Sequence, residues 1–391
     1  MLKKRYLTPF VIEDLEEKMV FISGPRQVGK TTLSRELVAV HIDHCVYYNW
    51  DYKEDRKQIL GSKWPSDAKL IILDEIHKYR RWKTLIKGNY DKWKKEYKFL
   101  VTGSGNLNTY RKGGDSLQGR YHHFRLHPFT VAEYASIVVE APKPFLELTI
   151  SHSCSEDDFN ALFHFGGFPE PLIKHDARHL RRWHREKIER LFREDIRDIE
   201  AIRDLGTMQV LADLLPEKVG SPLSINSIRE DLEVSHKAVS HWMAVLESFY
   251  YHFRIYPFAS RKIRSLKKEP KLFLWDWSEI KDEGARFENM IASHLLKFVH
   301  FLHDYSGYKA ELYYLRDRDK REVDFLVTID GKPWFACEAK LSDSAISSHL
   351  NYFNEKLAIP FCYQIYKEGR EDYRKGNIRV LSAAGFLPCL F

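Results

Sequence analysis

One stretch, residues 19–40, constrains the fold of this chain more than any other. Its apolar start, MVFIS, predicts a short buried strand, and the pattern of residues 32–40 predicts a helix. The loop between them, GPRQVGKT, fits GxxxxGK followed by Ser or Thr, an arrangement that directs backbone N–H groups at phosphate oxygens. We expect Lys30 to reach the β- and γ-phosphates of a nucleotide and the Thr31 hydroxyl to bind magnesium. The predicted nucleotide-binding residues are Gly24, Pro25, Arg26, Gln27, Val28, Gly29, Lys30, Thr31 and Thr32.

A second apolar run, residues 70–73, ends in two carboxylates, Asp74 and Glu75. A carboxylate just beyond a strand end can lie over the γ-phosphate, where it can orient magnesium or water. We therefore expect Asp74 to orient magnesium through water, and Glu75 to act as the general base that polarises the attacking water.

Two further positions are open to either a catalytic or a plain structural role. Residues 98–101 predict another strand, and Thr102 or Ser104 at its end would sense the γ-phosphate or hold the water; the alternative is an ordinary turn. Arg120 would stabilise transition-state charge in its own subunit or a neighbouring one, or is a surface arginine. The sequence has no NKxD stretch after these strands, which favours ATP over GTP.

Four segments together, GPRQVGKTTL, LIILDEIHK, VTGS and a GR followed by HPF, resemble successive signatures of bacterial and archaeal AAA-superfamily ATPases of the AAA_14 group. Members of that group carry a C-terminal domain of unknown function. The resemblance extends over essentially the whole chain and is strongest over residues 18–135. It implies an α/β core of parallel sheet and helices that uses ATP and Mg²⁺, but it supplies no substrate.

The middle of the chain predicts a connector followed by helices. Residues 178–205 have a helical apolar pattern with charges of mixed sign, which favours packing on the ATPase over contact with nucleic acid. Residues 206–265 predict a winged helix-turn-helix, in which Ser224 and Ser235 cap two helices joined by a short turn and residues 250–256 form the wing strand. Such a module binds DNA or another protein. The predicted DNA contacts are Lys237, Ser240 and His241 on the second helix and Arg261, Lys262 and Arg264 in the basic run beyond it.

The C-terminal part carries an ordered set of charged residues: Glu288 on a predicted helix, Asp324 on a strand, and Glu338 with Lys340 on the next strand. This order resembles the PD-(D/E)xK nuclease core, so the domain is expected to be an α/β, restriction-endonuclease-like fold. The resemblance implies carboxylates that hold a second Mg²⁺ or a Mn²⁺ at a phosphodiester, and a lysine that polarises water or steadies charge.

The turn between these two strands decides whether the set shares one face. A two-residue turn at Asp330-Gly331 would place Asp324 opposite Cys337 and turn Glu338 to the other face. A three-residue loop, residues 329–331 with Gly331 left-handed, would place Asp324 opposite Ala336 and align Asp324, Glu338 and Lys340. Only the three-residue loop places the apolar residues of both strands together on the other face, and it is therefore the prediction; these residues are Val323, Phe325, Val327, Phe335 and Cys337.

The composition limits the class of protein, its partners and its compartment. With 391 residues, of which 44% are hydrophobic and 14% aromatic, the chain can build two or three domains and is not disordered. The net charge of +7 permits an anionic partner without requiring one. The five cysteines have no zinc-site spacing and suit a reducing cytoplasm, and no apolar run is long enough to span a membrane.

These observations predict an ATP-binding and ATP-hydrolysing protein that engages DNA and carries a second site for its cleavage. The predicted parts are an AAA-type P-loop domain (1–135), a connector with a charged helix (136–205), a winged helix (206–265) and a nuclease-like domain (266–391). The alternative is a nucleotide-switched regulator that binds a protein or DNA, with a catalytically silent scaffold. A third possibility is a homo-oligomeric ring motor, in which Arg120 acts between subunits.

Overall fold

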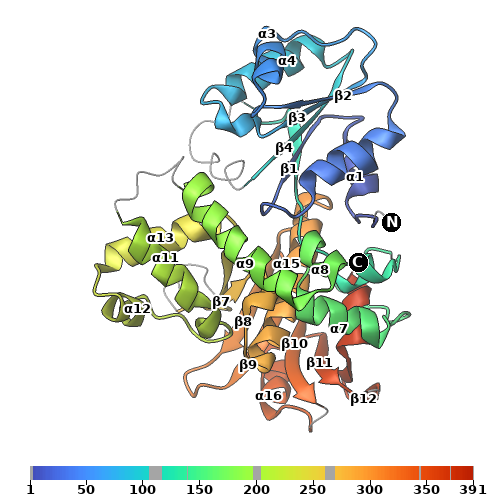
Figure 1. Cartoon of the computed structure of the whole chain (residues 1–391). Coiled ribbons are helices and arrows are strands. Elements are labelled where there is room, and N and C mark those ends of the chain that lie inside the picture. Colours follow the sequence, from blue (N-terminus) through green and yellow to red (C-terminus); the bar gives the residue numbers. More distant parts are fainter. Residues whose placement is uncertain are drawn as a thin grey trace. The chain divides into compact units, whose positions relative to one another are not determined.

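The computed structural model describes residues 3–104, 117–138, 140–196, 204–259, 269–342, 345–369 and 371–390. The chain divides into two compact units, Met1–His127 and Pro128–Phe391 (Figure 1). Each helix in the described part of the chain is too short or too polar to span a membrane.

The first unit is built on a five-stranded sheet with the order β2-β3-β4-β1-β5, and all of its strand pairs are parallel. Every residue of β1 and β3 is buried, which explains why these strands are continuous apolar runs in the sequence. Because the strands are parallel, the segments that follow β1, β3 and β4 meet at one edge of the sheet. The strands are β1 (Met19–Ser23), β2 (Cys45–Asn49), β3 (Leu70–Asp74), β4 (Lys98–Gly103) and β5 (Tyr121–Arg125).

Helices cover this sheet. The loop after β1 leads directly into α2, which continues as η1 and η2. Helices α3 and α4 pack on the face that carries Phe21, Ile71 and Phe99. The parallel α/β core agrees with the predicted fold. The helical segments are α1 (Thr8–Asp14), α2 (Lys30–Thr32), η1 (Leu33–Val38), η2 (Ala39–His41), α3 (Lys53–Gly61), η3 (Ile76–Lys78) and α4 (Trp82–Trp93).

The second unit is built on a mixed eight-stranded sheet with the order β12-β13-β11-β10-β9-β8-β6-β7. The long helix α15 (Glu283–Asp304) packs against β7, β8, β9 and β10, and α16 (Ser348–Leu357) packs against β9 and β10 (Figure 1). The strands are β6 (His252–Pro257), β7 (Lys271–Leu274), β8 (Ala310–Arg316), β9 (Glu322–Ile329), β10 (Lys332–Ser342), β11 (Phe361–Glu368), β12 (Tyr373–Lys375) and β13 (Ile378–Ser382).

Shorter helices complete the second unit. Ser224 and Ser235 cap α12 and α13 by accepting hydrogen bonds from backbone N–H groups, as predicted. The helical segments are α6 (Val131–Ala135), α7 (Glu156–Phe165), α8 (Pro169–Lys174), α9 (Ala177–Arg190), η4 (Leu191–Ile196), α11 (Leu205–Leu214), η5 (Leu215–Lys218), α12 (Ile225–Asp231), α13 (His236–Ser248), η6 (Trp277–Glu279), α17 (Ala383–Phe386) and η7 (Leu387–Leu390).

The second unit differs from the predicted division in two places. Strand β6, expected as the wing of a separate module, pairs with β7 and with β8, so it belongs to the same sheet as β9 and β10. Helices α11 and α13 share one hydrophobic core with α15. The described residues on both sides of the expected boundary at 265 therefore form one unit. Helix α6, assigned by prediction to the first domain, also belongs here, because Glu133 pairs with the buried ammonium of Lys297 on α15.

Candidate functional site

The loop after β1 is shaped by backbone that only particular residues allow. A Cβ atom on Gly24 would clash with the backbone oxygen of Leu126, so the close approach of these two segments requires glycine. Gly29, directly before α2, has a φ of 98°, in the left-handed region that favours glycine. The Lys30 ammonium is buried and donates to the carbonyl oxygens of Gly24 and Pro25 at 3.0 and 2.8 Å. The loop thus holds the positive charge of Lys30 close to the end of β1.

Asp74, at the end of β3, is fixed by three hydroxyl groups. Thr31 and Tyr47 donate to its Oδ2 atom at 3.0 and 2.7 Å, and Thr102 donates to Oδ1 at 2.6 Å. The structure therefore brings together Thr31 and Asp74, the two predicted magnesium residues. Their oxygens suit Mg²⁺, which binds proteins through one or two such groups together with waters and substrate phosphates. Thr102 lies at the predicted place and orients Asp74.

Glu75 follows Asp74 in a left-handed conformation, with a φ of 56°. Its N–H donates to the Thr102 carbonyl oxygen at 3.0 Å, which ties the ends of β3 and β4 together. Burial raises the pKa of the Glu75 carboxyl; the charge of Lys30 opposes this shift and that of Asp74 adds to it. A carboxylate with a raised pKa is a stronger base, which suits the predicted role of Glu75.

A buried histidine lies beside Glu75 and was missed by the sequence reasoning. The Nε2 atom of His77 lies 3.6 Å from Oε2 of Glu75 and 3.4 Å from the Ser104 hydroxyl. Burial lowers the pKa of His77 to about 4, so the ring is neutral at neutral pH. Ser104 therefore contacts the predicted base through this ring.

Arg120 does not lie at this edge of the sheet. It precedes β5, and its carbonyl oxygen accepts from the N–H of Met19, the first residue of β1. The carboxyl end of β5, where the loop lies, is five residues on, or about 16 Å at roughly 3.3 Å per residue. The Arg120 guanidinium instead pairs with Asp91 on α4 at 2.7 and 3.1 Å. This geometry excludes a role for Arg120 at the loop of its own chain; action on a neighbouring subunit stays a prediction.

In the second unit, the β9–β10 hairpin aligns the predicted charged residues by a different route from the one expected. The turn has two residues, Asp330 and Gly331, since Ile329 pairs with Lys332. The expected three-residue loop is therefore wrong. The pairing then shifts by one residue between Pro333 and Phe335, so Trp334 is the extra residue of a β-bulge.

The bulge restores the alignment that the short turn would have broken. Beyond it Cys337 pairs with Phe325, and the same register places Glu338 directly opposite Asp324, so the predicted pairing of Asp324 with Ala336 is wrong. Asp324, Glu338 and Lys340 consequently share one face, as predicted. Phe325, Val327, Phe335 and Cys337 lie in the core with α15, whereas Val323, expected with them, packs in the smaller cluster beside α16.

A buried lysine that was not predicted binds this group. The Lys271 ammonium, on β7, lies 2.9 Å from Glu288, 2.8 Å from Glu322 and 3.4 Å from Asp324. Burial acts to lower the pKa of Lys271, but the charges of Glu288, Asp324 and Glu322 raise it well above its ordinary value. We call Lys271, Glu288, Glu322, Asp324, Glu338 and Lys340 the carboxylate cluster.

Glu338 is the member of the cluster with a carboxylate oxygen that accepts no hydrogen bond from the described residues. Its Oε1 atom accepts from Lys340 at 2.8 Å, but its buried Oε2 atom has no hydrogen-bond partner among the described residues. Burial, and then the charge of Asp324, raise the pKa of Glu338 to about 7. An unpartnered buried carboxylate oxygen beside a second carboxylate fits a bound cation.

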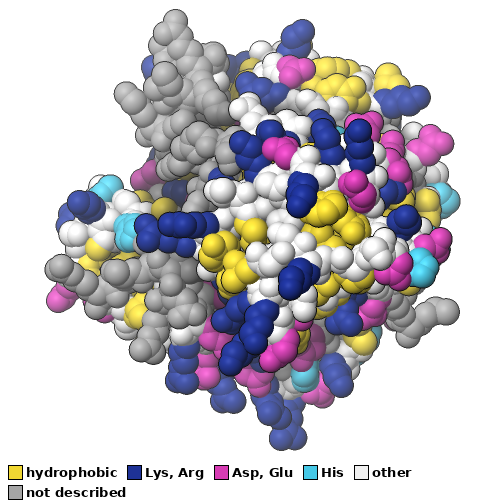
Figure 2. Space-filling model, turned by 90° about the horizontal axis from the view of Figure 1, so that it is seen from above, with side chains coloured by type: hydrophobic (Ala, Val, Ile, Leu, Met, Phe, Trp, Pro, Cys, Tyr) yellow, Lys and Arg dark blue, Asp and Glu magenta, His cyan; other side chains and the backbone are white. Residues whose placement is uncertain are grey.

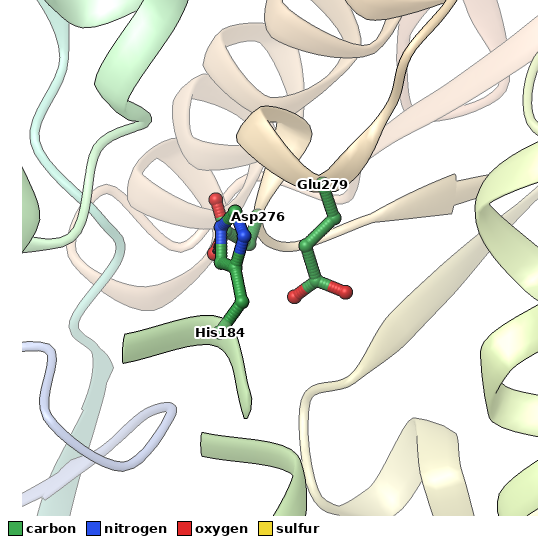
Figure 3. A group of neighbouring side chains, drawn as sticks. All are labelled: His184, Asp276 and Glu279. Atoms are coloured by element: carbon green, nitrogen blue, oxygen red, sulfur yellow. Dashed lines mark ion pairs between the residues drawn. The ribbon is translucent and has the colours of Figure 1, made fainter. Parts of the chain in front are cut away.

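A second carboxylate group in this unit has its ligand atoms occupied. Figure 3 shows His184 of α9 with Asp276 and Glu279, whose ligand atoms lie within 4.8 Å of one another. The Lys187 ammonium lies 2.9 Å from Asp276 and also pairs with Glu279, while Ser278 donates to Asp276 at 2.6 Å. Although burial acts in the other direction, Lys187 holds the pKa of Asp276 well below its usual range. This group is an ion-pair cluster that ties α9 to η6.

The predicted DNA contacts are described only in part. Lys237 and His241 are exposed on α13, and Ser240 is half-buried between them. Arg261, Lys262 and Arg264 lie outside the described residues. On the face drawn in Figure 2, basic and acidic side chains are intermixed.

Comparison with protein families agrees with the geometry of the loop. Residues 16–135 match the AAA_14 family, described as an AAA domain. The first part of the chain is an AAA domain. Residues 156–278 and 283–386, which follow the AAA domain, match two families described as domains of unknown function, DUF8612 and DUF4143.

Relatives extend beyond the AAA domain. The uncharacterized protein MJ1637 of Methanocaldococcus jannaschii is 24% identical over 334 residues, which cover 73% of this chain and 69% of that protein. MJ1544 of the same organism is 23% identical over 346 residues, covering 82% and 74%. Among solved structures, Thermotoga maritima RuvB, a Holliday junction branch migration motor, has a TM-score of 0.34 at 16% identity and covers 64% of this chain and 90% of its own. Aeropyrum pernix ORC1 in complex with DNA has a TM-score of 0.32 at 14% identity, covering 75% and 93%.

Proposed function

We propose that this protein binds ATP with Mg²⁺ in the loop of residues 24–32 and hydrolyses it. The observation that carries the proposal is the meeting of Lys30, Thr31, Asp74 and Glu75 at one edge of a parallel sheet, with Thr31 donating to Asp74. The match of residues 16–135 to an AAA domain supports it.

Each residue has a distinct part in this reaction. Lys30 and the backbone N–H groups at the start of α2 would bind the phosphates. Bound magnesium would supply positive charge at the phosphate oxygens, held by Thr31 and oriented by Asp74. Glu75 would accept a proton from the attacking water. Tyr47 and Thr102 keep the Asp74 carboxylate in place through their hydroxyl groups.

Replacing Lys30 tests this proposal. In Lys30→Ala, ATP affinity or turnover should fall by at least about 100-fold, because the ammonium acts on charge at the phosphates. Lys98→Ala is the matched control, since Lys98 lies at the opposite end of β4 and pairs with Glu16; it should bind and hydrolyse ATP as the wild type does. Wild-type affinity and turnover in Lys30→Ala would overturn the proposal.

A second function is favoured by the free oxygen of Glu338. We infer that the second unit is a nuclease-like domain that engages DNA, with Lys237, Ser240 and His241 as contacts, and that the carboxylate cluster cleaves it with a divalent ion. Asp324 and Glu338 would hold the ion, and Lys340 would polarise the attacking water or steady the developing charge.

Cleavage of labelled single- and double-stranded DNA and RNA, with Mg²⁺ or Mn²⁺ and with or without ATP, tests the second function. Cleavage by the wild type that is lost in Glu338→Ala would support it and show whether ATP controls it. Absence of cleavage on every substrate would favour a nucleotide-switched regulator with a silent scaffold.

A further inference from the structure

The ammonium of Lys271 has the surroundings of a metal ion. Lysine has three N–H donors, and this one faces three carboxylates at 2.8 to 3.4 Å. The residue is 1% exposed. Its hydrogen-bonding capacity is therefore used entirely by Glu288, Glu322 and Asp324.

The side of the cluster that holds Glu288 is also closed by the backbone. A Cβ atom on Gly220 would lie 2.8 Å from Oε2 of Glu288, and Gly220 has a φ of 75°, which favours glycine. The chain thus approaches the Glu288 carboxylate as closely as a residue without a side chain allows. A hydrated ion at Glu288 would have to displace both this segment and the ammonium.

The negative charges of the cluster exceed its positive charges, so one more cation can bind, and the place for it is at Glu338. Lys271 compensates Glu288, Glu322 and Asp324, and Arg316 also pairs with Glu322 at 2.7 Å. Lys340 pairs with Oε1 of Glu338. What remains is the buried Oε2 atom of Glu338, directly across the hairpin from Asp324.

The ion-pair cluster of α9 and η6 shows the contrasting case. There the Lys187 ammonium pairs with Asp276 and Glu279. His184 and Ser278 also contact Asp276, and Tyr251 donates to Glu279. No oxygen of those two carboxylates is among the described buried atoms that lack a hydrogen-bond partner. In that group Lys187 and its neighbours contact both carboxylates. In the carboxylate cluster, by contrast, Lys271 contacts three carboxylates but not Glu338.

We propose that Lys271 is the resident cation of the carboxylate cluster and takes the place of a second divalent ion. The cluster consequently binds a single divalent ion, at Asp324 and Glu338, and none at Glu288. The proposal rests on the second proposed function for the presence of that ion. It assigns Lys271 as a positioning residue: the ammonium holds Oδ1 of Asp324, and the N–H of Ala339 donates to Oδ2 at 2.9 Å, so the carboxylate is fixed opposite Glu338.

The test is a count of bound Mn²⁺ by electron paramagnetic resonance and calorimetry on the nucleotide-free full chain. An Asp74→Asn background keeps the P-loop site from adding an ion. The parent should bind one ion, and Glu338→Gln should lose at least about tenfold in affinity. Glu288→Gln should keep the parent affinity, because the ion does not lie there.

Removing the lysine should create the missing ion site. Lys271→Ala leaves three half-buried carboxylates with only Arg316 beside Glu322, so it should bind a second Mn²⁺, and Mn²⁺ should raise its thermal midpoint more than that of the parent. Lys297→Ala is the matched control: this buried lysine pairs with Glu133 and does not belong to the carboxylate cluster, so the variant should lose stability without gaining an ion.

Three results would overturn the proposal. They are two ions bound to the parent, an equal loss of affinity in Glu288→Gln and Glu338→Gln, and a folded Lys271→Ala that binds no additional ion. Because Glu288→Gln keeps an oxygen acceptor for Lys271, its result decides the matter even where Lys271→Ala does not fold. A parent that binds one ion and cleaves no nucleic acid would end the proposed cleavage but leave the role of Lys271 intact.

Discussion

Two glycines of the first unit illustrate how much one absent Cβ atom can matter. Gly24 lies against the backbone oxygen of Leu126, whereas Gly88 is exposed within α4 and has nothing near the place of a Cβ. Gly24→Ala should therefore distort the loop and abolish ATP binding. Gly88→Ala should raise the free energy of unfolding by about 0.5–1 kcal/mol, because alanine loses less backbone entropy in a helix. Thermal unfolding and ATP titration of both variants provide the measurement, and ATP affinity unchanged by Gly24→Ala would contradict the expectation.

His294, in the core of the second unit, makes the free energy of unfolding depend on pH. Its Nδ1 atom bonds the Met290 carbonyl oxygen at 2.7 Å, and its Nε2 atom accepts from the N–H of Val131 at 3.0 Å. Both ring nitrogens are thus committed to the neutral form, and burial lowers the pKa of His294 to about 3. The unfolded chain, in which the pKa is about 6.5, binds the proton first. The free energy of unfolding should therefore fall as the pH falls below about 6.5, by up to about 1.4 kcal/mol per pH unit.

Denaturant unfolding between pH 7 and pH 4.5 measures this dependence. His294→Gln cannot titrate, so its unfolding free energy should decline less steeply than that of the wild type. Other buried histidines, such as His252 with a pKa lowered by burial to about 4, keep part of the slope in both proteins. Identical slopes in the two proteins would contradict the assignment.

The sequence predicted those site residues whose position is set by a short local segment of the chain. Lys30 and Thr31 lie in a loop whose shape is local, and Asp74 and Glu75 follow a recognisable strand. Tyr47 could not be found in this way, because its contact with Asp74 depends on the register of β2 on β3. Lys271 begins an apolar strand, and only the packing of that strand beside Glu288 and Asp324 gives it a role.

At the scale of elements, the β9–β10 hairpin shows that side-chain alternation can give the correct face of a strand while the register is wrong. The turn is one residue shorter than expected and Trp334 is an extra residue of β10, so Asp324 lies opposite Glu338, two positions from the expected Ala336 but on the same face. Side-chain alternation alone identified the shared face of Asp324 and Glu338, because every register that buries the apolar set gives that result. It could not separate a long turn from a short turn with a bulge, since both have the same parity.

Trp334 should be the costliest residue of this hairpin to truncate. The indole is fully buried, packs on Phe298 at 5.6 Å between ring centroids, and donates to the carbonyl oxygen of Leu146 at 2.8 Å. Trp334→Ala should lower the free energy of unfolding by about 3–5 kcal/mol, through a cavity beside α15. Trp334→Phe keeps a ring and loses the hydrogen bond, so we expect a loss of about 1–2 kcal/mol. Urea unfolding compares the two variants, and equal losses would show that the indole N–H rather than the ring volume matters.

At the scale of the whole molecule, the division into units lies before α6. The core cluster that includes α15 and the eight-stranded sheet begins at Phe129 and Val131, and the cluster that packs α3 and α4 lies within the first unit. The sequence predicted a boundary at 135, where the match to the AAA domain also ends, whereas the burial of α6 is set by contacts distant in sequence. Val131 and Glu133 reach residues of α15 more than 160 positions away.

Two fragments that differ only by α6 and the residues before it distinguish these boundaries. Residues 128–391 contain a complete core and should unfold in one cooperative transition at a midpoint unaffected by ATP. Residues 136–391 lack Glu133 and Val131, which removes the carboxylate of the buried Lys297 ammonium and opens the core beside His294. Loss of one partner of a buried ion pair costs about 3–5 kcal/mol, so the shorter fragment should be less stable by at least this amount. Equal urea midpoints for the two fragments would instead place α6 outside the unit, and the Glu133–Lys297 pair would then contribute nothing to its folding.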